Sequence, residues 1–98
     1  MKKLPNIHPG EVLREEFLIP HGISQYRLAK DIGVPQMRIS AICNGKRGIS
    51  ADTAVRLARY FGSTPGFWLG LQTDYDTEEA EKALKKSRIQ IPRFDAVA

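Results

Sequence analysis

The sequence predicts a small all-α domain built from five to six short helices. Three observations support this fold class. The chain has 98 residues, a length that allows one compact domain. Proline, glycine and helix-capping residues divide it into segments of helical length. Within these segments apolar residues recur at helical spacing, and the alternation typical of strands is confined to the C-terminal end.

The first predicted helix begins near Pro9, which suits the first helical position because its missing N–H is not needed there. Three apolar residues share one face of this segment: Val12, Leu13 and Phe17. Pro20 and Gly22 end it. Ser24 is a good N-cap for a second helix that runs through Ile32.

Gly33 is a good C-terminal stop for the second helix, and Pro35 then opens a third that runs to about Asn44. Ser50 caps the fourth helix, in which Asp52 faces the positive end of the helix dipole. The apolar stripe of this fourth helix follows helical spacing and consists of Ala54, Leu57, Ala58 and Phe61.

A fifth helix is predicted to start at Thr64 and Pro65, and a short charged sixth helix at Thr77. Residues 88–94 alternate polar and apolar, which is typical of a short edge strand, but Pro92 limits such a strand and a frayed tail is the alternative. The expected organisation is one helical domain over 1–76, to which the motif described below belongs, and a short charged helix with a C-terminal tail over 77–98.

Composition excludes several classes of protein. Hydrophobic residues make up 42% and charged residues 27%, which is ordinary for a globular chain. There is no run of the ~20 apolar residues that a membrane span needs, and the basic N-terminus has no apolar stretch behind it, so we expect neither a membrane partner nor a secretory signal. The single cysteine, Cys43, excludes an internal disulfide framework. A cytoplasmic protein is expected.

Residues 25–44, with the sequence QYRLAKDIGVPQMRISAICN, meet the requirements of a helix-turn-helix. Ala29 is small where the two helices cross. Gly33 tolerates the left-handed backbone of the turn. Ile39 and Ile42 form the buried side of the second helix, which leaves its opposite side and its N-terminal tip exposed.

The net charge of +4 is modest, but most of it lies in one stretch. Residues 33–48 contain Arg38, Lys46 and Arg47 and no acidic residue, for a net charge of +3. A local basic patch attracts polyanions, and nucleic acid first among them.

This pattern resembles the helix-turn-helix of the Cro/CI-type (XRE, lambda-repressor-like) DNA-binding family. The resemblance rests on Gln25, Ala29, Gly33 and the aliphatic pair Ile39 and Ile42. A wider match over roughly residues 7–76 is similar to the HigA-type, or VapI-like, antitoxins. It is carried by six segments: 8–11, 13–17, 24–29, 44–54, 57–62 and 67–72. The chain departs from the family at Gly70, where asparagine is more usual.

The resemblance implies a protein that binds its operator as a homodimer and represses its own operon. It also implies neutralisation of a RelE-like (HigB-type) mRNA endonuclease toxin. The alternative is a stand-alone transcriptional regulator of the same fold without a toxin. A neighbouring toxin gene would favour the antitoxin over this regulator. A protein-interaction module is a third hypothesis, against which the acid-free stretch 33–48 argues.

A recognition helix presents its N-terminal residues to base edges in the major groove. The predicted base-contacting residues are Gln36, Met37, Arg38, Ser40 and Ala41. Arg38 suits either a guanine or a phosphate, and Ser40 a base or a phosphate; partial burial is the alternative for Met37. The predicted phosphate-contacting residues are Gln25, Asn44, Lys46 and Arg47. Tyr26 and Arg27 are further candidates for backbone contacts.

The fifth helix is the predicted source of the dimer interface, through Phe67, Trp68 and Leu71. One short helix is not expected to bury so many large apolar side chains in its own domain. The alternative for Trp68 is a place in the intramolecular core.

No catalytic or metal site is expected, and no cofactor. His8 and His21 each adjoin a proline and lie far apart in the sequence, so a shared metal is not expected. Glu15 and Glu16 are adjacent on their helix and therefore diverge, which rules them out as an acid–base pair. The protein is not expected to be an enzyme.

Overall fold

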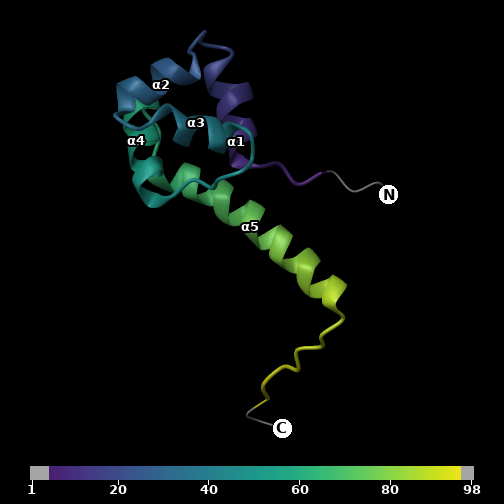
Figure 1. Ribbon diagram of the computed structural model, residues 1–98. Coiled ribbons are helices and arrows are strands. Elements are labelled where there is room, and N and C mark those ends of the chain that lie inside the picture. The colour runs from purple at the N-terminus through teal and green to yellow at the C-terminus, as the bar shows by residue number, and fades with distance from the viewer. Residues whose placement is uncertain (1–4, 96–98) are drawn as a thin grey trace.

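The structure, a computed structural model, describes residues 5–95, and helices are the only regular secondary structure over that range (Figure 1). Its elements are α1 (Pro9–Val12), which continues directly as the π-helical segment η1 (Leu13–Leu18), then α2 (Gln25–Ile32), α3 (Gln36–Cys43), α4 (Ala51–Phe61) and α5 (Pro65–Ser87). Residues 1–4, part of the basic N-terminus in which no secretory signal is expected, and 96–98, the end of the predicted tail, lie outside the described residues.

The predicted helix starts and stops are confirmed through the beginning of α5. Ser24 Oγ accepts a hydrogen bond from Arg27 N at 3.0 Å, and Ser50 and Thr64 cap α4 and α5 in the same way. Gly33 ends α2 with φ +74°, a left-handed conformation that costs little for glycine. Local sequence signals thus place the helices before any tertiary packing is considered.

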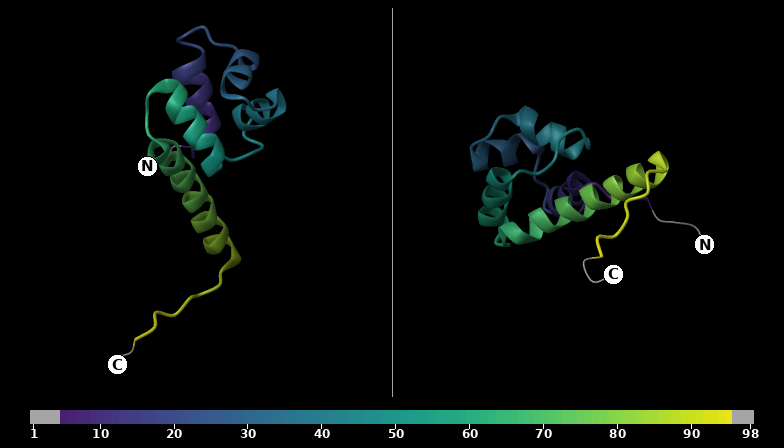
Figure 2. Two further views of the ribbon diagram at one scale, coloured as in Figure 1. Left: turned by 90° about the vertical axis from the view of Figure 1, so that its left-hand side faces the viewer. Right: turned by 90° about the horizontal axis from the view of Figure 1, so that it is seen from below.

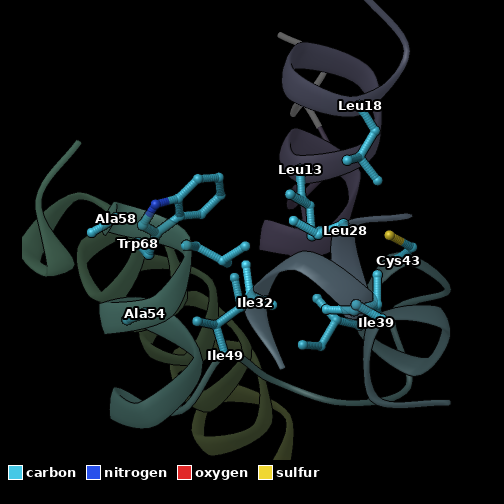
Figure 3. Packing of buried hydrophobic residues seen from close by; sticks show 13 residues of the cluster. Leu13, Leu18, Leu28, Ile32, Ile39, Cys43, Ile49, Ala54, Ala58 and Trp68 are labelled. Atoms are coloured by element: carbon cyan, nitrogen blue, oxygen red, sulfur yellow. The ribbon is translucent and has the colours of Figure 1, made fainter. Parts of the chain in front are cut away.

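One hydrophobic core joins η1, α2, α3, α4 and α5 (Figure 3). The side chains of Leu13, Leu28, Ile39, Ile42 and Leu57 are fully buried, and each contributes about 1.5–3 kcal/mol through burial. Ala29 is only 2% exposed where α2 meets α3, as the helix-turn-helix geometry requires. The predicted buried side of α3 and the predicted close crossing at Ala29 are therefore confirmed.

Helix α1 contacts the backbone of α3 directly. A Cβ atom on Gly10 would lie 1.7 Å from the carbonyl oxygen of Ile42, so only glycine allows this approach. One turn later, Arg14 Nη1 donates to the carbonyl oxygen of Cys43 at 3.1 Å, at the C-terminus of α3. The other end of α3 begins after Pro35, which provides no side-chain cap. Contacts from α1 and η1, rather than a side-chain cap of its own, therefore fix the position of α3.

The prediction that Trp68 forms a dimer interface is wrong, because its side chain is 0% exposed within the single chain. Its ring centroid lies 4.8 Å from that of Phe17 and 6.3 Å from that of Phe61, and its Nε1 donates to Ser63 Oγ at 3.0 Å. Phe17 and Phe61 come from η1 and α4, which together enclose the indole. The alternative, an intramolecular core position, is what the structure shows.

The prediction of a separate sixth helix is also wrong, because α5 runs without a break from Pro65 to Ser87 (Figures 1 and 2). The residues around Thr77 are compatible with a helix interior, and Lys82 pairs with Glu78 at 3.4 Å across one turn. Helix α5 ends only where Arg88 adopts a φ of +63°. It leaves the body of the domain, which gives extents of 56 × 31 × 23 Å.

The segment after α5 forms no strand in its described part, residues 88–95, and all of these residues are exposed. The radius of gyration is 17.0 Å, compared with about 13 Å for a compact chain of this length. The excess comes from the projecting half of α5 and this tail (Figure 2). The edge-strand prediction is therefore wrong, and the tail alternative describes the segment.

Candidate nucleic-acid interface

Helix α3 presents its N-terminal tip and one face to solvent. Gln36 and Met37 are exposed, Met37 by 83%, and Asn44 is exposed where the helix ends. Ile39 and Ile42 anchor the opposite face at 0% exposure. The alternative of partial burial for Met37 is therefore wrong. A helix exposed on one side and at its tip has the form that enters a major groove.

A hydrogen bond between α2 and α3 fixes the rotation of α3. Ser40 Oγ donates to Gln25 Oε1 at 2.9 Å, and both residues are half-buried. Ser40, a predicted base or phosphate contact, thus already has a partner inside the protein. Ala41, beside it on α3, is half-buried and places a methyl group at the outer flank. The structure therefore brings Gln25 and Ser40 together.

Arg38 lies on the flank of α3 that faces α4. Its Nη1 donates to Asp52 Oδ2 at 2.7 Å, and its side chain is 23% exposed. Arg56 Nε donates to the same carboxylate at 3.1 Å and 3.2 Å. The hydrogen bond from Arg38, followed by those from Arg56, lowers the pKa of Asp52, so this carboxylate is ionised at neutral pH. Nothing in the sequence pattern indicates this pairing, because Arg38 and Asp52 lie on different helices.

Lys46 and Arg47 project from the loop between α3 and α4. Both are exposed, and neither forms an ion pair with another residue of the range 5–95. Such cations are available to phosphate groups. Together with Asn44 they place three of the predicted phosphate-contacting residues just beyond the C-terminus of α3.

Helix α5 holds this loop in place through Gln72, which sequence reasoning also missed. Gln72 Oε1 accepts from the backbone N–H of Ile49 at 2.7 Å, and Gln72 Nε2 donates to Asp76 at 3.0 Å. A Cβ atom on Gly48 would lie 3.0 Å from the Gln72 side chain, so glycine permits the approach. The glycine in the loop was the available signal, but it does not identify its partner.

An open hollow of about 480 Å³ lies between this loop, the N-terminal segment and α5. His8 and Tyr75 form one wall, with ring centroids 4.9 Å apart in an edge-on arrangement. His8 also caps α1, because its Nδ1 accepts from Gly10 N at 2.9 Å, and burial lowers its pKa. The histidine has a structural role, and the hollow borders the basic loop rather than forming a separate site.

The candidate dimer residues lie on α5, apart from the recognition helix. Phe67 is 41% exposed and Leu71 is half-buried, so both still offer apolar surface. Within residues 5–95 no group of three or more His, Cys, Asp or Glu side chains is placed to hold a metal ion. None of the helices in the described part of the chain is both long and apolar enough to cross a membrane.

Comparisons with known proteins agree with this geometry. A helix-turn-helix family model matches residues 13–68, which include α2, α3 and the buried Trp68. Virulence-associated protein I of Dichelobacter nodosus is 50% identical over 90 residues, which are 92% of this chain and 83% of that protein. The match therefore extends beyond the helix-turn-helix itself into α5 and the tail.

Several solved structures of similar proteins contain DNA. The antitoxin HigA of Pseudomonas aeruginosa with the higBA promoter has a TM-score of 0.83 at 42% identity, covering 88% of this chain and 97% of that one. The antitoxin GraA in complex with its operator has a TM-score of 0.86 at 39% identity, covering 98% of both chains. At these identities the likeness extends to the sequence as well as to the fold.

Proposed function

This chain belongs to the helix-turn-helix family of Cro/CI (XRE) type, among the HigA-type and VapI-like proteins, and from that premise we propose that it is a sequence-specific DNA-binding antitoxin that represses its own operon. The family is one of DNA-binding antitoxins and regulators, which is not an enzyme class. The observation that carries the proposal is the exposed tip of α3, held on a body similar to an antitoxin solved with its promoter.

In the proposed complex the Gln36 amide forms hydrogen bonds with N6 and N7 of an adenine, and Met37 contacts thymine methyl groups. Asn44, Lys46 and Arg47 bind phosphates and set the register of the protein on the duplex without reading sequence. The Gln25–Ser40 hydrogen bond keeps α3 at the rotation that exposes its tip, and Ala41 allows close approach to the groove.

This proposal is tested with the full chain and a duplex that it selects from a randomised pool. Gln36→Ala should weaken discrimination at one base pair by ~1–3 kcal/mol. Lys46→Ala should weaken binding to all sequences alike and reduce the salt slope by about 0.9. If Gln36→Ala leaves the sequence preference unchanged, the assignment of this side chain to a base edge is wrong. Selection of no duplex by the wild type would contradict the DNA-binding function.

We propose a homodimer, because one helix-turn-helix makes few contacts and two related half-sites lie about 34 Å apart on B-DNA. Phe67 and Leu71 support an interface on α5, since both leave apolar surface exposed. Leu71→Asp should then yield a helical monomer with much weaker operator binding, measured by sedimentation and circular dichroism. A wild type that stays monomeric and still binds a palindrome tightly would contradict the dimer.

The proposed protein partner is a RelE-like (HigB-type) toxin, and the proposed compartment is the cytoplasm, where operon DNA lies. The support is the likeness to proteins named antitoxins. Co-expression with the neighbouring reading frames should co-purify a small basic protein and relieve its toxicity. Operator binding without any such partner would favour a stand-alone regulator.

A further inference from the structure

Asp52 lies where a negative charge reduces the basic character of the candidate nucleic-acid interface. Residues 33–48 contain three cations and no acidic residue, and the carboxylate that reaches Arg38 comes from the first turn of α4. At 2.7 Å the Arg38–Asp52 pair has the length of a charge-assisted hydrogen bond. Lys46 and Arg47, by contrast, stand exposed without an ion pair to any residue from 5 to 95.

The position of Asp52 is fixed from two sides. Its backbone is in the first turn of α4, where the helix dipole favours a negative charge. Its carboxylate also accepts from Arg56, whose Nη1 donates to the carbonyl oxygen of Ile32 at 2.6 Å at the end of α2. Asp52 therefore belongs to a polar bridge that joins α2, α3 and α4. The carboxylate accepts the hydrogen bond of the Arg38 guanidinium that a DNA phosphate would otherwise accept.

A guanidinium that is already paired gains less from a phosphate than a free one, because the first contact must be broken. This cost falls on non-cognate DNA, which is bound through its phosphates alone. On a duplex that fits the tip of α3, base contacts supply the binding free energy and Arg38 stays paired with Asp52. We infer that Asp52 is a specificity-determining residue that acts through Arg38, by withholding this cation from phosphates of non-cognate DNA. The inference rests on the proposed function and deepens it.

The experiment compares the dissociation constants of the full chain for two duplexes, the one selected from the randomised pool and a scrambled duplex of equal composition. Asp52→Asn is measured beside Glu81→Gln, which changes the net charge equally at an exposed position on α5. We expect Asp52→Asn to lower the Kd for scrambled DNA about two- to fivefold more than the control does, the range for one exposed ion pair. The salt slope on scrambled DNA should grow by about 0.9.

The specificity ratio is the Kd for scrambled DNA divided by the Kd for the selected duplex. It should fall in Asp52→Asn. It should recover when Asp52→Asn is combined with Arg38→Gln, because this double variant has no guanidinium to release. Circular dichroism of each variant checks that the fold is intact. Two outcomes would overturn the inference even if the wild type selects its duplex. One is an equal effect of Asp52→Asn and Glu81→Gln on the Kd for scrambled DNA. The other is a gain in affinity for scrambled DNA that persists in the variant without Arg38. A wild type that selects no duplex overturns the proposed function and this inference with it.

Discussion

The two halves of α5 differ in what stabilises them. The first half lies against the body of the domain, where Trp68 is fully buried and Gln72 and Tyr75 contact the basic loop and His8. The second half leaves the body, and every residue from 79 to 95 is exposed. Tertiary packing stabilises the first half, whereas helix propensity and local ion pairs such as Glu78–Lys82 stabilise the second. One continuous helix therefore combines a part that is packed on the domain and a part whose side chains are exposed.

The contrast between the two halves of α5 predicts that the largest loss of stability occurs on substitution of Trp68, in the packed half. Trp68→Ala removes an indole that Phe17 and Phe61 enclose, and should lower the free energy of unfolding by ~3–5 kcal/mol. Leu84→Ala, on the projecting half at 42% exposure, should change it by less than about 0.5 kcal/mol. Urea denaturation measures both. Comparable losses in the two variants would show that the projecting half is packed after all.

Two glycine substitutions extend the contrast to the backbone. Gly10→Ala places a methyl group where the carbonyl oxygen of Ile42 lies, so α1 must shift, and we expect a loss at the upper end of ~1–3 kcal/mol. Gly70→Ala is the matched control, because a Cβ atom there meets nothing within 4 Å and alanine favours the helix by roughly 0.5–1 kcal/mol. Thermal unfolding should show shifts of opposite sign. Shifts of the same sign would contradict the close approach of α1 to α3.

A smaller effect is expected at Gln72, which connects α5 to the basic loop. Gln72→Met keeps the length of the side chain but leaves Ile49 N–H without its acceptor, at a cost of about 1 kcal/mol. Faster hydrogen exchange of the Ile49 amide is the direct measurement. Gln90→Met, in the exposed tail, is the control and should change neither stability nor exchange. Unchanged exchange in Gln72→Met would mean that another group holds the loop.

The smallest effect concerns two carboxylates with lowered pKa values, Asp52 in the body and Glu79 at the start of the projecting half. Arg38→Gln should raise the pKa of Asp52 towards its ordinary value, because the largest cause of its lowering is removed. The pKa of Glu79, which is lowered first by the hydrogen bond from Asn6, should not move. Side-chain carbon NMR during a pH titration measures both.

The direction of the accompanying stability change follows from the lowered pKa. The pairing of Asp52 stabilises the fold above the ordinary pKa of an aspartate, and this stabilisation is lost as the pH falls through the lowered value in the folded state. Arg38→Gln should therefore flatten the acid limb of the stability curve in that window. An unchanged acid limb would indicate that Asp52 contributes no measurable stability.

Local signals were sufficient to predict most of the fold from the sequence. Caps such as Ser24 and a left-handed glycine such as Gly33 act over a few residues, so the ends of the early helices follow from nearby sequence. The length of α5 did not follow, since nothing near Thr77 distinguishes a helix start from a helix interior. The burial of Trp68 does not follow from local sequence either, because its enclosing partners, Phe17 and Phe61, come from distant parts of the chain.

The candidate site was predictable to a similar extent and for similar reasons. Helical spacing alone placed Gln36 and Met37 on the outer side of α3, and the structure finds both exposed. The partners of Arg38 and Ser40 were not foreseen, because Asp52 and Gln25 lie on other helices and only the tertiary fold brings them close. Sequence periodicity identifies which side faces outward, but it does not identify side chains that already have a partner.

The dependence of α3 on its neighbours limits how far the recognition helix can be transplanted. It has eight residues and no side-chain cap at Pro35, and the carbonyl oxygen of its last residue, Cys43, accepts its hydrogen bond from Arg14 of η1. A helix this short is marginal in water, so a synthetic peptide of this segment would be a coil without affinity for DNA. New binding preferences are therefore better engineered by exchanging Gln36 and Met37 on the intact domain. In this protein the unit of recognition is the whole folded body, not one helix.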